Sequence, residues 1–283
     1  MPVTYSLHKI YGERNFDFHP DDYSRFKFGD GAIAKKFGES LADGFIREQL
    51  AGQPSRQQMV VVPSPYAFIP TATFAMKNHF VFRLNRWLAR HHLPVVQEAK
   101  VHRTTTYKED YGELNAEQRI KLIGNDSFHI DKAFIKDKMI LFLDDIRITG
   151  SHEKMIMRMS EQYGLTNNMY LLYFAELINT EVHPNIENFL NYHYVKSIFD
   201  LPSIVQSDSF FINTRIIKYI LNTAPEDCKA FLQHQSRHFV NLLYDMALGN
   251  GYHTLEAYQQ NMNWIMKYLD AKETTEQQRF VKS

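Results

Sequence analysis

Residues 139–152 have the sequence MILFLDDIRITGSH. The first five residues are apolar and predict a buried β-strand, and two adjacent carboxylates, Asp144 and Asp145, follow at its carboxyl end. A short loop then leads through Thr149-Gly150-Ser151 into a segment with the composition of a helix. We interpret this order as one strand, loop and helix of an open α/β sheet, because such sheets bind ligands at the carboxyl ends of their strands.

The same alternation of elements continues on both sides of this segment. Residues 59–62 form a short apolar run, mostly valine, that is ended by prolines; residues 71–91 have helical spacing, and residues 169–175 predict another strand. The pattern predicts an α/β fold with a doubly wound parallel sheet that is covered on both faces. Further expected elements are a helix at 32–49, a strand at 94–103, and helices at 210–222, 228–249 and 255–269.

These elements suggest three parts of the chain. We expect an N-terminal segment at residues 1–24, a core at 25–182 and a helical C-terminal subdomain at 183–283. A long polar stretch, residues 104–138, has the character of a lid over a binding site.

Composition limits the kinds of partner. Among 283 residues, Lys+Arg and Asp+Glu both number 32, so there is no overall basic field to bind nucleic acid in bulk or an anionic membrane. No apolar run approaches the roughly 20 residues that span a bilayer. Cys228 is the only cysteine, which excludes an internal disulfide framework and fits a reducing, cytoplasmic location.

The residues around the two carboxylates suit a sugar phosphate. A Thr-Gly-Ser loop before a helix can direct backbone N–H groups and hydroxyls at a phosphate, and the helix N-terminus adds favourable partial charge. Asp144 and Asp145 can accept hydrogen bonds from a pair of sugar hydroxyls. The alternative is that they are solvated acids at the end of a strand, which is common in α/β proteins.

The segment resembles the PRPP motif of type I phosphoribosyltransferases, in which an apolar strand leads to two acids and a Thr-Gly phosphate loop. The resemblance implies that Asp144 and Asp145 bind the ribose hydroxyls. It implies that the 5-phosphate loop consists of Arg147, Ile148, Thr149, Gly150, Ser151 and His152.

Other segments extend this resemblance over roughly residues 23–175. Residues 23–30, YSRFKFGD, look like the Lys-x-Gly-Asp opening of ComF-like members, and more faintly like phosphoribosyltransferase-like proteins of bacterial stress-resistance operons. Residues 60–66 look like the first strand and the pyrophosphate loop, the latter formed by Ser64, Pro65 and Tyr66. Residues 103–128 have the spacing of the flexible catalytic loop, which would bring Arg103, Lys108 and Arg119 to the pyrophosphate.

Two departures from the family pattern bear on function. The family usually has Thr or Ser where this chain has His152, and Arg147-Ile148 replaces a pair that is usually small or contains Thr. The pyrophosphate loop lacks the glycine of many members, and Pro63 and Pro65 each remove a backbone donor; the alternative is that these prolines only terminate the strand.

The resemblance implies a phosphoribosyltransferase that displaces pyrophosphate from PRPP, or runs the phosphorolytic reverse, with Mg²⁺ bound through PRPP rather than by direct protein ligands. The alternative is a non-catalytic protein of the same fold that binds PRPP or a nucleotide as a regulator. The departures favour this alternative, whereas the intact Asp144-Asp145 pair and the long lid favour catalysis. A third hypothesis is that the C-terminal helices bind a partner and that the ligand controls assembly. The resemblance also implies a hood that recognises the acceptor, formed either by the N-terminal segment, residues 5–28, or by the C-terminal helices. The sequence leaves open the acceptor and the oligomeric state, a homodimer included.

Overall fold

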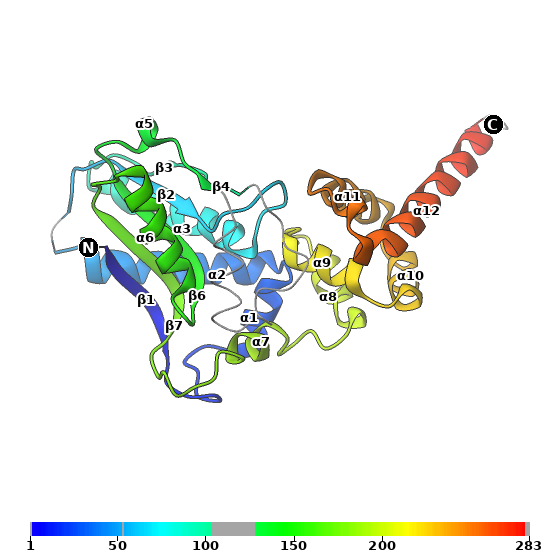
Figure 1. Ribbon diagram of the computed structural model, residues 1–283, viewed down its shortest axis with the longest axis horizontal. Coiled ribbons are helices and arrows are strands. Elements are labelled where there is room, and N and C mark those ends of the chain that lie inside the picture. Colours follow the sequence, from blue (N-terminus) through cyan, green and yellow to red (C-terminus); the bar gives the residue numbers. More distant parts are fainter. Residues whose placement is uncertain (1, 53, 104–127, 281–283) are drawn as a thin grey trace.

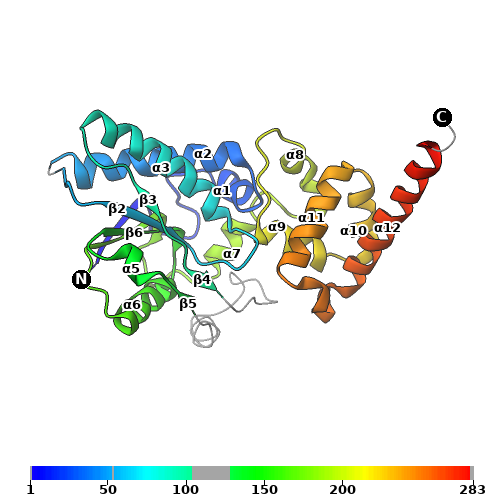
Figure 2. The same cartoon turned by 90° about the horizontal axis from the view of Figure 1, so that it is seen from above.

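The computed structural model of the chain describes residues 2–52, 54–103 and 128–280. Among these residues no helix is both long and apolar enough to span a membrane. A parallel sheet with helices on both faces occupies the N-terminal two thirds, and a group of helices follows it (Figures 1 and 2).

Five parallel strands form the main sheet in the order β1-β7-β6-β2-β3. Their bounds are Val3–Ile10 for β1, Met59–Pro63 for β2, Gln97–Glu98 for β3, Met139–Arg147 for β6 and Met169–Leu177 for β7. A separate antiparallel pair, β4 (His102–Arg103) and β5 (Phe128–His129), lies on either side of residues 104–127 in the sequence.

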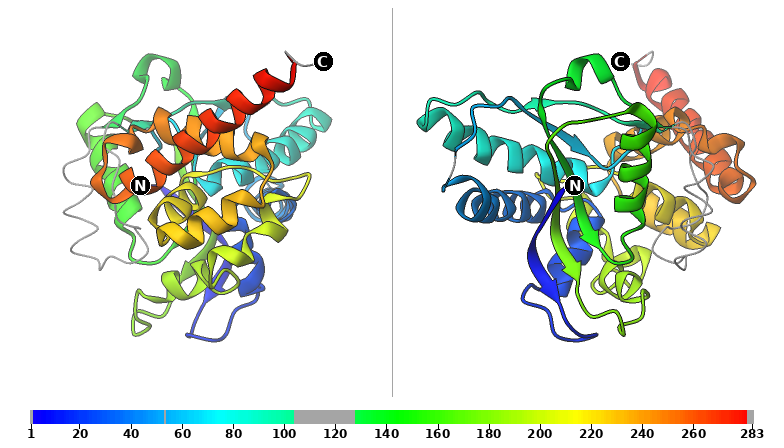
Figure 3. Two further views of the ribbon diagram at one scale, coloured as in Figure 1. Left: turned by 90° about the vertical axis from the view of Figure 1, so that its right-hand side faces the viewer. Right: turned by 60° about the vertical axis from the view of Figure 1, so that its left-hand side comes forward.

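Successive strand residues face opposite sides of the sheet, and both sides are apolar. One side packs against α2 (Gly31–Phe45) and α3 (Ala72–Arg90), and the other packs against α6 (Ser151–Tyr163), so the sheet lies between two helical layers (Figure 3). Within β6, Leu141 and Leu143 face the first layer, whereas Ile140 and Phe142 face the second. The predicted parallel sheet with helices on both faces is confirmed.

The chain reverses its direction of travel across the sheet between β2 and β6. From β2 it proceeds through α3 to β3 at one edge, and from β6 it proceeds through α6 to β7 toward the other. The carboxyl ends of β2 and β6 therefore flank the topological switch point, which is where open α/β sheets bind ligands.

A second apolar core lies in the C-terminal helices. Its buried residues run from Val195 to Leu269, with Phe28 and Ile69 inserted from the first part of the chain, and we call residues 195–280 the helical domain. Its helices are α8 (Pro202–Val205), α9 (Thr214–Asn222), α10 (Pro225–Gln233), α11 (Arg237–Gly249) and α12 (Glu256–Phe280). Outside this domain and the two helical layers lie three further helices: α1 (Pro20–Lys27), α5 (Lys132–Ile135) and α7 (Ile186–Asn191).

The structure corrects four details of the sequence predictions. Val3–Ile10, predicted to lie outside the core, is the edge strand β1, with Tyr5 and Ile10 buried in the main core. The residues predicted as one strand at 94–103 form two short strands, and those predicted as one helix at 228–249 form α10 and α11, separated where Ser236 caps α11. Asp144 and Asp145 lie within β6 rather than after it, because the strand continues to Arg147 alongside β7.

Candidate functional site

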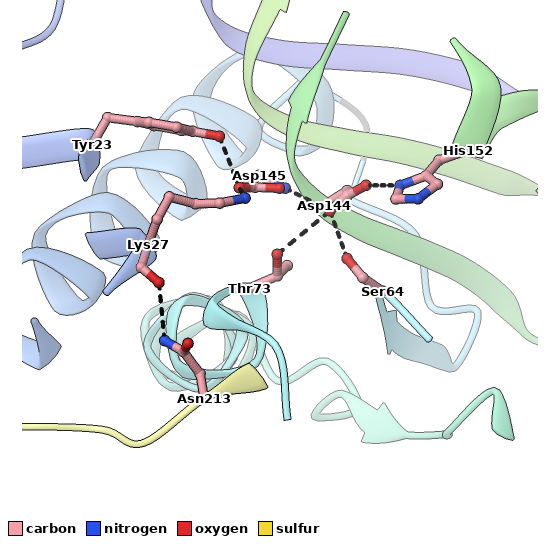
Figure 4. Close-up of polar contacts among 8 residues, drawn as sticks. All are labelled: Tyr23, Lys27, Ser64, Thr73, Asp144, Asp145, His152 and Asn213. Carbon is pink, nitrogen blue, oxygen red and sulfur yellow. Dashed lines mark hydrogen bonds and ion pairs between the residues drawn. The ribbon is translucent and has the colours of Figure 1, made fainter. Parts of the chain in front are cut away.

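Asp144 lies at the switch point with both carboxylate oxygens engaged by the protein. Ser64, directly after β2, donates to Oδ1 at 2.5 Å, and Thr73 at the start of α3 lies 3.4 Å from the same atom. His152 Nδ1, in the first turn of α6, lies 2.5 Å from Oδ2. Elements on both faces of the sheet thus converge on one buried carboxylate (Figure 4).

Asp145 is paired with α1, which the site prediction from the sequence had missed. Tyr23 Oη donates to Asp145 Oδ2 at 2.8 Å, and Lys27 Nζ forms an ion pair with the same oxygen. The Lys27 and Asp145 side chains are only 12% and 7% exposed, and Tyr23 is fully buried. The Lys-x-Gly-Asp pattern was the available signal for Lys27, although it gave no partner for that residue.

The two carboxyl groups have pKa values displaced in opposite directions. Burial acts to raise the pKa of Asp144, but the charge and hydrogen bond of His152 and the hydrogen bond from Ser64 outweigh it, and the pKa is lowered. The pKa of Asp145 is raised by burial and by the Asp144 charge, while Lys27 opposes the rise. Burial and the charge of Asp145 raise the pKa of Tyr23 well above its usual value, so Tyr23 acts as a neutral donor.

The predicted 5-phosphate loop forms the turn between β6 and α6. Gly150 has φ +68°, in the left-handed region, and Thr149 Oγ1 lies 2.7 Å from Ser151 Oγ. Arg147 is held by two acids, with Nε 2.6 Å from Glu153 and Nη1 2.6 Å from Glu176. Arg147 therefore neutralises protein carboxylates in this structure, and the loop offers its hydroxyls, its backbone and the N-terminus of α6 to an anion.

Of the predicted pyrophosphate loop, Ser64 lies at the acid pair formed by Asp144 and Asp145, whereas Tyr66 contacts Lys100 instead. Lys100 Nζ lies 4.0 Å from the centroid of the Tyr66 ring and donates to the backbone oxygen of Ala67 at 2.8 Å. Burial lowers the pKa of Lys100. Tyr66 and Lys100 thus support the turn after β2, and Pro65 follows Ser64 directly in it.

Of the three basic residues predicted in the lid, only the backbone of Arg103 belongs to the described part of the chain. The backbone of Arg103 lies in β4, paired with Phe128, while Lys108 and Arg119 lie outside the described residues. The structure brings together four of the predicted site residues: Ser64, Asp144, Asp145 and His152. Three further residues contact the two aspartates, namely Tyr23, Lys27 and Thr73 (Figure 4).

A pocket adjoins Asp144 on the α6 side of the sheet. Its lining includes the polar residues Ser64, Asp144, His152 and Tyr173. Most of the other lining side chains are apolar, and they come from β2, β6 and α6. Among the described residues no group of three or more His, Cys, Asp or Glu side chains forms a metal site.

The geometry is that of an α/β protein with a buried acid pair at its switch point, and comparison with known families identifies the class. The family model described as PRTase ComF-like matches residues 1–265, so the chain belongs to the ComF-like phosphoribosyltransferase family. Its fold is accordingly the type I phosphoribosyltransferase fold.

Solved structures of hypoxanthine phosphoribosyltransferases show similarity at low identity. One from Staphylococcus aureus is 11% identical, with a TM-score of 0.33, over 52% of this chain and 75% of that chain. The hypoxanthine-guanine enzyme of L. donovani is 12% identical, with a TM-score of 0.32, over 52% and 73%. None of the curated proteins compared with the chain matches it. The family assignment therefore rests on the family model.

Proposed function

We propose that the protein binds PRPP at the carboxyl ends of β2 and β6 and transfers its ribose 5-phosphate to an acceptor with release of pyrophosphate. The observation that carries the proposal is the adjacent pair Asp144 and Asp145, buried at the switch point and followed by the Thr149–Ser151 turn into α6. The carboxylates would accept hydrogen bonds from the ribose hydroxyls, and the turn would bind the 5-phosphate.

The residues present fit a magnesium ion that is held mainly by the ligand. Mg²⁺ commonly keeps several waters and binds substrate phosphates, so the ion would be bound through PRPP, while Asp144 and Asp145 accept hydrogen bonds from the ribose hydroxyls. The ion would neutralise charge on the pyrophosphate as it leaves. The chain's own contribution is to position the ribose and to hold Asp144 ionised through Ser64 and His152.

The experiment is a calorimetric titration of PRPP with Mg²⁺ into the wild-type protein and into Asp144→Asn and Asp145→Asn. We expect magnesium-dependent binding to the wild type and a loss of at least about tenfold in each variant, because an amide is a poorer acceptor for a hydroxyl than a carboxylate. Pyrophosphate release over a panel of bases and amines then tests transfer. Absence of binding by folded wild-type protein would contradict the proposal.

A second candidate is a PRPP- or nucleotide-binding regulatory protein without turnover. It is favoured by the engagement of Asp144 by Ser64 and His152 and of Arg147 by two glutamates, since a ligand has to compete with these contacts or add to them. The two prolines beside Ser64 favour it as well. Binding of PRPP without pyrophosphate release over the acceptor panel would support this candidate against catalysis.

A further inference from the structure

Lys27 connects the acid pair to the helical domain. Its Nζ is ion-paired with Asp145, and its backbone oxygen accepts a hydrogen bond from Asn213 Nδ2 at 3.2 Å (Figure 4). Asn213 is fully buried and caps α9, where its Oδ1 accepts from the Ile216 N–H at 3.2 Å. One side chain at the start of α9 thus holds the residue that pairs with Asp145.

The two residues after Lys27 are packed into the helical domain. Phe28 is fully buried in that domain's core, and its ring centroid lies 5.1 Å from that of Tyr219. The oxygen of Gly29 accepts a hydrogen bond from the Phe211 N–H at 2.9 Å. Because these contacts fix the backbone on the carboxyl side of Lys27, a shift at the start of α9 moves Lys27 with it.

Lys27 is the cation that offsets the burial of Asp145. Burial and the neighbouring Asp144 charge both favour the protonated form of Asp145, and Lys27 favours the ionised form. The other groups that act here are Tyr23 on α1, which donates to Asp145, and His152 on α6, which acts through Asp144. Glu187 on α7 and Arg215 on α9 act on Tyr23.

We propose that Lys27 is a positioning residue through which the helical domain controls whether Asp145 is available as a carboxylate to ligand hydroxyls. For the ribose of PRPP this inference rests on the proposed function. A molecule that binds the helical domain and shifts the start of α9 changes affinity at Asp145. By linkage, a ligand at Asp145 changes affinity at the helical domain by the same factor.

The test without ligand is the titration of the Asp145 carboxyl, followed by carbon-13 NMR and assigned with Asp145→Asn. Lys27→Met keeps the length of the side chain but removes its charge, and we expect it to raise the titration midpoint by about one to three pH units. Lys27→Arg should leave the midpoint close to that of wild type. A role in packing alone would give no such separation between Met and Arg.

Asn213→Ser tests the connection to the helical domain. It keeps an oxygen that can cap α9 and adds no charge, but it loses the Nδ2 donor to Lys27, so we expect a smaller shift of the Asp145 midpoint in the same direction. Asn261→Ser is the matched control, since Asn261 is buried in the same domain and its Nδ2 donates to the oxygens of Leu221 and Thr223. The control should leave the midpoint unchanged.

Two results would overturn the inference. One is an Asp145 midpoint that is the same in wild type and Lys27→Met, or in wild type and Asn213→Ser; the other is an equal shift in Asn213→Ser and Asn261→Ser. With Mg²⁺ and PRPP, we expect the affinity of Asn213→Ser to fall below that of wild type as the pH is lowered and to recover as the pH is raised. If wild type binds no PRPP, the proposed function fails, while the NMR titration still decides the coupling.

Discussion

His152 Nδ1 lies 2.5 Å from one carboxylate oxygen of Asp144, and Ser64 Oγ lies 2.5 Å from the other. Both oxygens of the acid that we propose for ribose binding are therefore already engaged by the protein. A ribose hydroxyl must displace one of these partners or add to them, so the strength of the His152 contact sets part of the affinity for ligand.

Replacing His152 tests this competition. We expect His152→Thr to bind PRPP with Mg²⁺ about fivefold more tightly than wild type, because a charge-assisted contact to Asp144 no longer has to be broken. Calorimetry measures the change. His234→Thr, at an exposed histidine at the end of α10, is the control and should leave affinity unaltered. Weaker binding by His152→Thr would instead mean that His152 contacts the ligand.

The lowered pKa of Asp144 predicts how the free energy of unfolding depends on pH in the acid range. A carboxyl group whose pKa is lower in the folded state stabilises the fold above its unfolded pKa of about 4, and this contribution is lost as the pH falls further. The raised pKa of Asp145 acts in the opposite sense, since its protonation favours the folded state.

We therefore expect the free energy of unfolding to fall more steeply below pH about 4 in wild type than in Asp144→Asn, by about 1–2 kcal/mol in total. Urea titrations between pH 2.5 and about 7 measure this difference. Equal slopes in the two proteins would show that the contacts of His152 and Ser64 do not favour the ionised form of Asp144.

Much of the fold could be predicted from local pattern, because the strands of a doubly wound sheet are continuous apolar runs. Residues 59–62 and 139–143 needed only their own composition to be recognised. β1 was missed because it lies at the edge of the sheet, where Thr4, Ser6 and His8 alternate with apolar residues and no apolar run forms. Its assignment depends on pairing with β7, a contact between residues more than 160 positions apart.

The site was predicted in part for the same reason. Asp144, Asp145 and His152 belong to one short segment, so the order of residues was sufficient to group them. Tyr23 and Thr73 carry no pattern that points to the acids, and only the docking of α1 and α3 against the end of β6 brings them there. The ion pairs that hold Arg147 were likewise unpredictable, since Glu176 is contributed by the neighbouring strand.

Tyr23→Phe removes the hydroxyl of Tyr23 but keeps the packing of its ring, so it tests the contribution of the hydroxyl alone. At pH 7 we expect a loss of about 1 kcal/mol in the free energy of unfolding, because a buried donor to Asp145 is removed. Since the pKa of Tyr23 is raised in the folded state, wild type should also lose stability as the pH rises above about 10, and Tyr23→Phe should lose less. Chemical denaturation from pH 7 to about 11 tests both effects, with the exposed Tyr11→Phe as control. Parallel profiles for all three proteins would contradict the expectation.

Gly29→Ala tests the contact between the core and the helical domain. Gly29 has φ +100°, and a Cβ there would lie 2.5 Å from the backbone oxygen of Phe211, so both the backbone conformation and the contact exclude a side chain. We expect a loss of about 2 kcal/mol or more in the free energy of unfolding, with faster proteolysis between the core and the helical domain.

Gly52→Ala is the matched control for that substitution. A Cβ at Gly52 meets no atom within 4 Å, and Gly52 has no left-handed φ to conflict with alanine, so stability should change by no more than about 0.5 kcal/mol. Thermal and urea unfolding of the two variants provide the comparison. If Gly29→Ala were as stable and as protease-resistant as Gly52→Ala, the helical domain would not be fixed to Lys27 through the residue that follows Phe28, and the coupling inferred for Asp145 would lose one of its supports.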